Sequence, residues 1–304
     1  MKSIAILIPC YNEEKTIAGV ISSFKKQIPD AIVYVYDNYS EDRTAAIAKG
    51  SGAVVVTVKN RGKGNVVRKM FADIDADIYV MADGDATYTA ADAPEMVKML
   101  DAESVDMVVA VRKEKNPEAY RAGHKVGNKL FNIILKTFFN SNFSDIFSGY
   151  RVFSKRFVKT FPISSNGFDI EAELSIHAIT LSIPFAEINS TYLERPKNSC
   201  SKLNTFTDGF KVLFSIINLL KEVRPLFFFS LISALLFFVA IFLAYPIVTT
   251  FIETGLVPRL PTAILSTGIT MISFVSLVCG LILDSISKTR LEMKKLHYLL
   301  FTNI

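Results

Sequence analysis

The C-terminal quarter of the chain contains two long runs without charge, and they restrict the possible folds more than any other feature. Leu226–Val248 has 23 uncharged residues, which as a helix would be roughly 34 Å long and would cross a hydrocarbon core of about 30 Å. Thr262–Leu283 is uncharged as well. Two core helices of a soluble protein are the alternative, but adjacent charge-free runs of this length are rare in soluble domains. We therefore predict transmembrane helices over residues 226–248 and 262–284.

The charges around these two runs predict their orientation. The connection between them carries only Glu253 and Arg259, whereas six basic residues lie just outside the pair. Because cytoplasmic flanks are enriched in Lys and Arg, we expect both termini and the N-terminal region on the cytoplasmic side of the inner (cytoplasmic) membrane. Met1–Pro9 is too short an apolar run for a signal peptide, and the three cysteines form no zinc or disulfide motif. The flanking basic residues are Lys221, Arg224, Lys288, Arg290, Lys294 and Lys295.

The region before Lys221 alternates between two patterns. Short runs rich in β-branched residues have the nearly continuous apolar character of strands that are buried on both faces. Segments with helical spacing lie between them, and one has Pro94 in its first turn with Asp92 as the expected cap. This alternation predicts an α/β domain with a Rossmann-like, mostly parallel sheet and helices on both faces. The expected strands are 3–9, 31–37, 53–58, 77–82 and 106–111, and the expected helices are 13–27, 41–49, 63–74, 93–100 and 168–181.

Polar residues follow four of the expected strands, at the edge where a parallel sheet binds its ligands. Asp83 and Asp85 can both present oxygens to a hard divalent cation, Mg²⁺ or Mn²⁺, whose shell is completed by substrate phosphates. Gly62 and Gly64 let the backbone approach an anion, while Lys63 adds a positive charge. Each segment alone could be an ordinary turn, a helix cap or a surface loop. Together they indicate a nucleoside-diphosphate site, although the chain has neither a Walker loop nor a G-x-G-x-x-G turn after its first strand.

The chain carries, in this order, the motifs PCYNEE (9–14), DNYS (37–40), RGKG (61–64), DGD (83–85), DIFSGYR (145–151), FDIE (168–171) and YLERP (192–196). Their order and spacing resemble family 2 glycosyltransferases of the GT-A fold. Within that family the resemblance is to the dolichol-phosphate mannose synthases and the bacterial polyisoprenyl-phosphate glycosyltransferases with two C-terminal transmembrane helices. It covers essentially the whole chain. It implies a cytoplasmic GT-A catalytic domain over residues 1–204, an amphipathic juxtamembrane helix over 205–224, and two transmembrane helices with a short cytoplasmic tail over 225–304.

The resemblance also implies roles for individual residues. Asp83 and Asp85 match the metal-binding pair, with Asp85 the more direct ligand, and Asp85, Asp145 and Arg151 form the implied catalytic set. Asp145 could act as a base or could orient its neighbours. Thr87 stands where the mannose synthases have a Gln that binds the metal, which leaves the third protein ligand open. The implied donor-binding residues are Pro9, Tyr11, Glu13, Asp37, Lys63, Asp83 and Arg195, and the implied acceptor-phosphate residues are Arg112, Ser148, Arg151 and Lys202.

The expected reaction is the inverting transfer of a hexose from a nucleotide-diphosphate sugar to a polyprenyl phosphate such as undecaprenyl phosphate. Its product would be a lipid-linked monosaccharide for cell-envelope glycosylation. A phosphate monoester has a second pKa near 6, so this acceptor is ionised without a dedicated base. UDP-glucose is the first expectation for the donor, and a GDP-mannose-dependent mannose synthase is the alternative. A processive polysaccharide synthase is disfavoured because its Gln-x-x-Arg-Trp motif requires a tryptophan, and the chain has none.

The expected partners are the nucleotide sugar, the polyprenyl phosphate and the membrane, and no nucleic acid. Apolar residues recur at helical spacing over 205–223, which predicts an amphipathic helix at the lipid headgroups, although a core helix would show the same period. A function of another class, a non-catalytic membrane module that binds nucleotide sugars, is disfavoured by the intact Asp83/Asp85 pair together with Arg112, Arg151 and Arg195. The transmembrane helices could also pack between protomers in a homo-oligomer.

Overall fold

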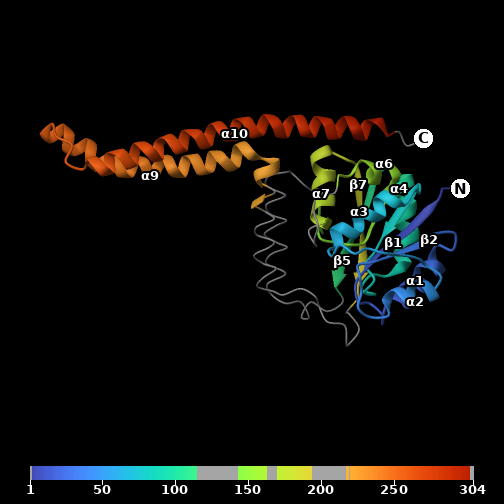
Figure 1. Cartoon of the computed structure of the whole chain (residues 1–304). Coiled ribbons are helices and arrows are strands. Elements are labelled where there is room, and N and C mark those ends of the chain that lie inside the picture. Colours follow the sequence, from blue (N-terminus) through green and yellow to red (C-terminus); the bar gives the residue numbers. More distant parts are fainter. Residues whose placement is uncertain (1, 115–142, 163–169, 194–216, 219, 302–304) are drawn as a thin grey trace. The chain divides into compact units, whose positions relative to one another are not determined.

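The computed structural model describes residues 2–114, 143–162, 170–193, 217–218 and 220–301, and the chain divides into two compact units (Figure 1). The first unit is Met1–Val212 together with Lys294–Ile304, and the second is Leu213–Met293. The sheet and its flanking helices belong to the first unit, and most of two long helices belong to the second. The amphipathic helix expected over 205–224 lies largely outside the described residues.

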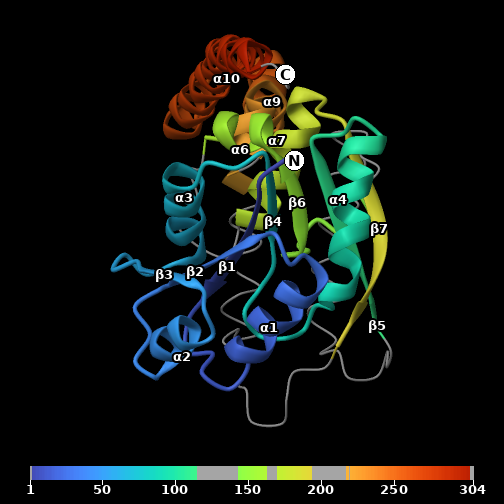
Figure 2. The ribbon, with the colours of Figure 1, turned by 90° about the vertical axis from the view of Figure 1, so that its right-hand side faces the viewer.

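A seven-stranded sheet forms the centre of the first unit (Figure 2). The strand order is β3-β2-β1-β4-β6-β5-β7, and neighbouring strands are parallel except where β6 pairs with β4 and β5. Because β6 is antiparallel, its amino end lies at the same edge as the carboxyl ends of β4 and β5. The strands are β1 Ile4–Cys10, β2 Ile32–Asp37, β3 Val54–Thr57, β4 Ile78–Met81, β5 Met107–Glu114, β6 Arg151–Ser154 and β7 Phe185–Tyr192.

Helices cover both faces of this sheet, because successive strand side chains point to opposite faces. On one face, Ile6 of β1 and Phe24 of α1 belong to a single hydrophobic core. On the other face, the ring of Phe71 in α3 lies edge-on to Tyr79 of β4 and Phe153 of β6, with centroids 6.4 and 5.8 Å away. The first face carries α1 Ile17–Gln27, α2 Thr44–Gly50, the short 3₁₀ helix Ala90–Asp92 and α4 Ala93–Ala102, and the second carries α3 Lys63–Asp73, α6 Lys155–Thr160 and α7 Ile170–Leu181.

The mostly parallel α/β sheet predicted from the sequence is confirmed, with the five expected strands all present. Two further strands were not expected. β6 has only four residues, and β7 is an edge strand with four polar residues among its eight, so neither has the continuous apolar run of a central strand. The expected N-cap residue of α4 is in place, but the hydrogen bond expected from its side chain to the helix is absent. Asp92 occupies the N-cap position, but its carboxylate accepts a hydrogen bond from Ser190 Oγ at 2.5 Å and makes no capping bond.

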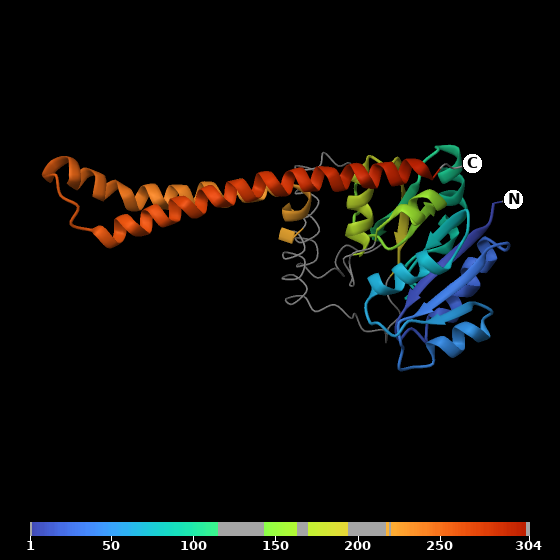
Figure 3. The same ribbon diagram turned by 45° about the horizontal axis from the view of Figure 1, so that its top comes forward.

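In the second unit, α9 (Pro225–Thr254) and α10 (Leu260–Leu300) lie side by side over most of their length (Figures 1 and 3). Both helices are long and apolar enough to cross a membrane, with mean hydropathies of 2.8 and 2.1 in their most apolar windows. Only 11% of each window is buried. A core helix of a soluble protein would bury such residues, so the exposure favours helices that face lipid.

Small residues allow α9 and α10 to pack closely. Ser273 Oγ donates a hydrogen bond to the carbonyl oxygen of Ser233 at 2.8 Å. A Cβ atom added to Gly280 would lie 2.9 Å from the Cβ of Phe229. Ser266, Ser273, Gly280 and Ser287 recur every seventh residue of α10. Ser273 and Gly280 of this series contact α9, and Ser287 Oγ donates to the carbonyl oxygen of Glu222, just before α9; small residues at such spacing let two helices pack closely.

The last turns of α10 belong to the first unit. The hydroxyl of Tyr298 donates a hydrogen bond to Asp106, which lies just before β5, and the Arg156 guanidinium lies 4.4 Å from the centre of the Tyr298 ring. Burial raises the pKa of Asp106, but hydrogen bonds from Arg156, Ser154 and Tyr298 outweigh it and hold that pKa below its usual value. The end of α10 is thereby held at the edge of the sheet where β5 begins.

Candidate active site

Several loops meet at the carboxyl edge of the sheet. The segments after β1, β2 and β4 all start there, and the segment before β6 reaches the same edge because that strand is antiparallel. The loops that follow the first two strands are joined by hydrogen bonds. Asn12, with a positive φ of 54°, donates its backbone N–H to Ser40 Oγ at 2.8 Å, and its Oδ1 accepts the N–H of Glu41 at 2.8 Å. The Glu13 N–H is bound by Thr44 Oγ1 at 2.8 Å.

Asp37 and Asn38 organise the end of β2. The Asp37 side chain is buried and accepts hydrogen bonds from the backbone N–H and the hydroxyl of Ser40. The Asn38 amide donates to the carbonyl oxygens of Val58 and Asn60 at 3.2 and 2.8 Å. Its Oδ1 accepts the N–H of Gly62 at 2.7 Å. These bonds fix the turn that begins α3 and presents Lys63.

Two predicted donor-binding residues lie at the carboxyl end of β1 and just after it. Pro9 is buried in β1, opposite Tyr36 of β2. The ring of Tyr11 lies 5.3 Å from the guanidinium of Arg61. Gly62 has a φ of 122°, a conformation that side-chain-bearing residues rarely adopt. The backbone therefore requires glycine immediately before Lys63.

Lys63 lies between two carboxylates from distant parts of the chain. Its Nζ is 2.5 Å from Asp83 Oδ1 and also donates to Glu171 Oε1 of α7. The Lys63 and Glu171 side chains are 11% and 7% exposed, whereas Asp83 is 28% exposed. Burial lowers the pKa of Lys63, but the attraction of the two carboxylates outweighs it and raises that pKa above its usual value. Lys63 is therefore a cation under all physiological conditions.

Asp85 lies deeper than Asp83. Its side chain is buried, and Oδ1 accepts hydrogen bonds from the N–H and the hydroxyl of Thr87 at 3.1 and 2.6 Å. Thr87, at the position for which the sequence leaves the third protein ligand open, thus orients Asp85 through its hydroxyl. No group of three or more acidic, His or Cys residues gathers at a metal site within the described ranges. A pair of carboxylates suits Mg²⁺ or Mn²⁺, which use one or two carboxylates together with phosphate oxygens and water. Asp83 and Asp85 fit that donor set.

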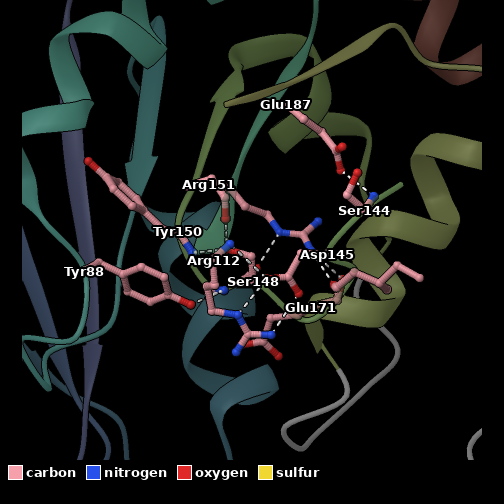
Figure 4. A network of polar contacts seen from close by, with 12 residues as sticks. Tyr88, Arg112, Ser144, Asp145, Ser148, Tyr150, Arg151, Glu171 and Glu187 are labelled. Atoms are coloured by element: carbon pink, nitrogen blue, oxygen red, sulfur yellow. Dashed lines mark hydrogen bonds and ion pairs between the residues drawn. The ribbon is translucent and has the colours of Figure 1, made fainter. Parts of the chain in front are cut away.

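Arg112 of β5 and Asp145 form a two-pronged ion pair at the same edge (Figure 4). Arg112 Nε donates to Asp145 Oδ2 at 2.7 Å, and Nη2 donates to Oδ1 at 2.8 Å. The Arg112 guanidinium lies 5.5 Å from the centre of the Tyr192 ring. Burial raises the pKa of Asp145, but Arg112 outweighs burial and holds that pKa below its usual value. Asp145 is thus an ionised acceptor that fixes the plane of the Arg112 guanidinium.

Ser148 and Arg151, both implied as acceptor-phosphate residues, lie fully inside the protein. Arg151 Nε donates to the Ser148 carbonyl at 2.8 Å, and Nη2 donates to the carbonyl oxygens of Ile146 and Glu171 and to Ser175 Oγ (Figure 4). Ser148 Oγ donates to the Ala110 carbonyl at 2.6 Å. Burial lowers the pKa of Arg151 to about 10, so the guanidinium remains charged near neutrality. Its contacts fasten the segment before β6 to α7.

Two further site predictions, Arg195 and Lys202, lie outside the described residues. The structure adds Glu171, Asn38 and Gly149, whose roles the sequence motifs alone do not indicate. Glu171 could have been noticed as an acidic residue between Ile170 and Leu174 in an apolar helix, because a buried carboxylate needs a charged partner. Gly149 leaves room for Asp83, since a Cβ there would lie 2.7 Å from Asp83 Oδ2.

Comparisons with known proteins identify the family. Residues 5–161 match the family described as Glycosyl transferase family 2. Along its length the chain is 32% identical over 304 residues to the glycosyltransferase AglJ of Haloferax volcanii, with 98% of each chain covered. The chain therefore belongs to glycosyltransferase family 2, as its motifs predict.

Other relatives are more distant or shorter. The dolichyl-phosphate hexose transferase of Haloferax volcanii is 25% identical over 221 residues, which cover 73% of this chain and 95% of that protein. The protein RfbJ of Shigella flexneri is 55% identical over 124 residues, 40% of this chain and 96% of that protein. The crystal structure of Mycobacterium tuberculosis glucosyl-3-phosphoglycerate synthase with Mn²⁺, UDP and glucosyl-3-phosphoglycerate has a TM-score of 0.60 and 24% identity, and the match covers 72% of this chain and 79% of that chain. This likeness confirms the GT-A fold.

Proposed function

We propose that the protein transfers a hexose from a nucleotide-diphosphate sugar to a polyprenyl phosphate at the membrane surface, with inversion at the anomeric carbon. One observation carries the proposal: the Asp83/Asp85 pair and Arg112, which is paired with Asp145, lie at the same edge of the sheet. The similarity to the glycosyltransferase AglJ supports the reaction class, and the similarity to the dolichyl-phosphate hexose transferase supports the lipid acceptor. The two apolar helices supply a membrane attachment for an enzyme with a lipid substrate.

On the donor side, the loops after β1 and β2 hold the nucleoside. Pro9 and Tyr11 line the base. The Asp37 carboxylate, which accepts hydrogen bonds from Ser40, and the Glu13 carboxylate, which accepts one from Thr16 Oγ1 at 3.3 Å, bind ribose hydroxyls and base edges. Arg195 binds the diphosphate. A divalent cation on Asp83 and Asp85 would neutralise the departing diphosphate. The Mn²⁺ and UDP bound by the structural neighbour support both the cation and a UDP-sugar, with UDP-glucose the first choice.

On the acceptor side, the lipid phosphate is the nucleophile. Its second pKa near 6 leaves it largely ionised at cytoplasmic pH, so the enzyme needs to position the anion more than to deprotonate it. The Arg112 fork, oriented by Asp145, binds phosphate oxygens in two-pronged geometry, and Lys202 adds a charge. Ser148 and Arg151 act through the backbone that they hold. The low pKa of Asp145 makes this carboxylate a poor base and a good orienting group.

The product would be a lipid-linked monosaccharide for cell-envelope glycosylation. With the basic flanks of α9 and α10 facing the cytoplasm, the protein is a multi-pass protein of the cytoplasmic membrane whose catalytic domain and both termini are cytoplasmic. Phosphate oxygens of the acceptor then meet a cytoplasmic nucleotide sugar at the headgroup boundary. Close packing within the α9/α10 pair leaves its outer apolar faces for lipid or for further copies of the chain.

One assay tests the proposal. The purified full-length protein in liposomes is incubated with undecaprenyl phosphate, Mg²⁺ or Mn²⁺, and labelled UDP-glucose, UDP-N-acetylglucosamine or GDP-mannose in parallel. We expect label in the organic phase from UDP-glucose, and label from GDP-mannose instead would identify the mannose-synthase alternative. Binding of a donor without transfer from any of the three would favour a non-catalytic module and would overturn the proposal. The Asp83→Asn/Asp85→Asn protein is the blank.

Gly149 provides a second test, because a methyl group there must displace the Asp83 carboxylate. A Cβ at this position would also lie 3.2 Å from Lys63 Nζ. We expect Gly149→Ala to lower kcat by about 10²-fold, the effect of a misplacement near 1 Å at a reacting centre. Gly19→Ala in α1 is the matched control, since a Cβ there meets nothing within 4 Å. Equal activity of both variants would show that the Asp83 position does not matter for transfer.

A further inference from the structure

Lys63 joins two parts of the site that are far apart in the sequence. Lys63 and Glu171 are separated by 108 positions, and Lys63 and Asp83 by 20. The lysine begins α3, Asp83 follows β4, and Glu171 lies in the first turn of α7. In the described part of the chain, the ion pairs of Lys63 are those with Asp83 and Glu171. A single ammonium thus has two carboxylates within reach.

The position of Lys63 matters because its ammonium is bound to a carboxylate oxygen that a metal ion would need as a ligand. Asp83 Oδ1 is the atom that Lys63 contacts at 2.5 Å. The other oxygen, Oδ2, lies against Gly149, so Asp83 has little room to turn away. Lys63 would have to release Oδ1 for Asp83 to ligate a divalent cation, and two such positive charges cannot share one oxygen at low cost.

Once Lys63 leaves Asp83, its ammonium needs another partner. The side chain is only 11% exposed, and an unpaired buried charge is strongly unfavourable. Glu171 is already in contact with Lys63 and is held in place, because its backbone carbonyl accepts hydrogen bonds from Arg151 Nη2 at 3.1 Å and Ser175 Oγ at 3.0 Å. Glu171 can therefore hold Lys63 without moving its own helix.

We propose that Glu171 is a positioning residue for the transfer reaction: it retains Lys63 when Asp83 binds the divalent cation. The inference rests on the proposed function, in which Asp83 and Asp85 bind that cation. Glu171 also balances charge, because it keeps one carboxylate for the ammonium and leaves the Asp83/Asp85 pair for the metal and the diphosphate. Lys63, retained at the site, is then placed to attract the phosphates of the donor.

The test measures Mn²⁺ binding to the full-length protein by electron paramagnetic resonance, with and without UDP and with no sugar donor or lipid. In Glu171→Gln, Lys63 has only Asp83, so we expect the dissociation constant for Mn²⁺ to rise about tenfold. In Lys63→Met the competing ammonium is absent, and we expect the constant to fall about tenfold. In the double variant the glutamate has no lysine to retain. Adding Glu171→Gln to Lys63→Met should therefore change the dissociation constant for Mn²⁺ by no more than about threefold.

The matched control is Glu187→Gln. Glu187 is a carboxylate of β7 in the same polar network, where it accepts the N–H of Ser144 at 2.8 Å (Figure 4), and we expect unchanged Mn²⁺ binding. If Glu171→Gln weakened Mn²⁺ binding tenfold both in the unchanged protein and in Lys63→Met, Glu171 would act by its charge alone. That result would overturn the inference. Unaltered Mn²⁺ binding in Glu171→Gln, a variant of nearly the same shape, would do the same. If the unchanged protein bound no Mn²⁺ even with UDP, the metal site of the proposed function would fail and the inference with it.

Discussion

Replacement of Asp85 by Asn is expected to lower kcat for hexose transfer by at least about 10³-fold, comparable with the loss of a main electrostatic group at an active site. The reason is the charge rather than the fold. An Asn oxygen can still accept the two Thr87 hydrogen bonds at 3.1 and 2.6 Å, whereas the negative charge that would hold a divalent cation against the leaving diphosphate is lost. The measurement is the rate of label transfer at saturating donor, acceptor and Mn²⁺.

Asp92→Asn is the matched control for this variant. Asp92 is also an aspartate of the first unit that accepts a hydrogen bond from a hydroxyl, that of Ser190, but it lies at the start of α4. We expect its kcat to remain within about twofold of the unchanged protein, as for most substitutions away from a site. If Asp85→Asn kept more than a tenth of the activity, or if a chelator left transfer intact, the leaving group would be neutralised by protein cations alone.

The part of the site that follows from local sequence could be predicted. The runs before Asp37 and Asp83 are β-branched and apolar, so they predict buried parallel strands, and such strands bring their carboxyl ends to one edge. The structure has both residues at that edge. The two long uncharged runs are likewise a local signal, and they correspond to α9 and α10. In these cases the length of each apolar run and the polar residues that follow it were sufficient to predict the element and its place in the fold.

The burial of Arg151 could not be predicted from its motif. A surface arginine and a buried one look the same in the sequence, and the difference depends on β6, a four-residue strand inserted between β4 and β5. That strand is too short to be recognised by its period. Arg151 begins it and turns inward to backbone carbonyls, including that of Glu171. The ion pair of Glu171 with Lys63 is equally non-local, because only the three-dimensional fold brings the first residue of α3 to the first turn of α7.

Asp145→Asn separates two roles for this residue. If Asp145 orients Arg112, its loss frees the guanidinium to rotate and weakens the hold on the lipid phosphate. We then expect the KM for polyprenyl phosphate to rise and kcat/KM to fall by about 10²-fold, with kcat reduced less than tenfold. A general base would show the opposite pattern, in which kcat falls by 10²- to 10⁴-fold and KM is unchanged. Asp75→Asn, which breaks an exposed ion pair with Lys155, is the control and should leave both parameters within about twofold.

The pH dependence of the unchanged protein distinguishes the same two roles. The pKa of Asp145 lies below its usual value of 3.8 because Arg112 outweighs burial. The carboxylate and the stability that it contributes are thus present above that value and are lost only as the pH falls through the lower pKa of the folded protein. Near neutrality Asp145 does not titrate, so any rising limb of kcat/KM near pH 6 belongs to the acceptor phosphate. Asp145→Asn should retain that limb at the same pH. A limb that disappeared with Asp145 would instead assign the titrating proton to this carboxylate and restore it as the base.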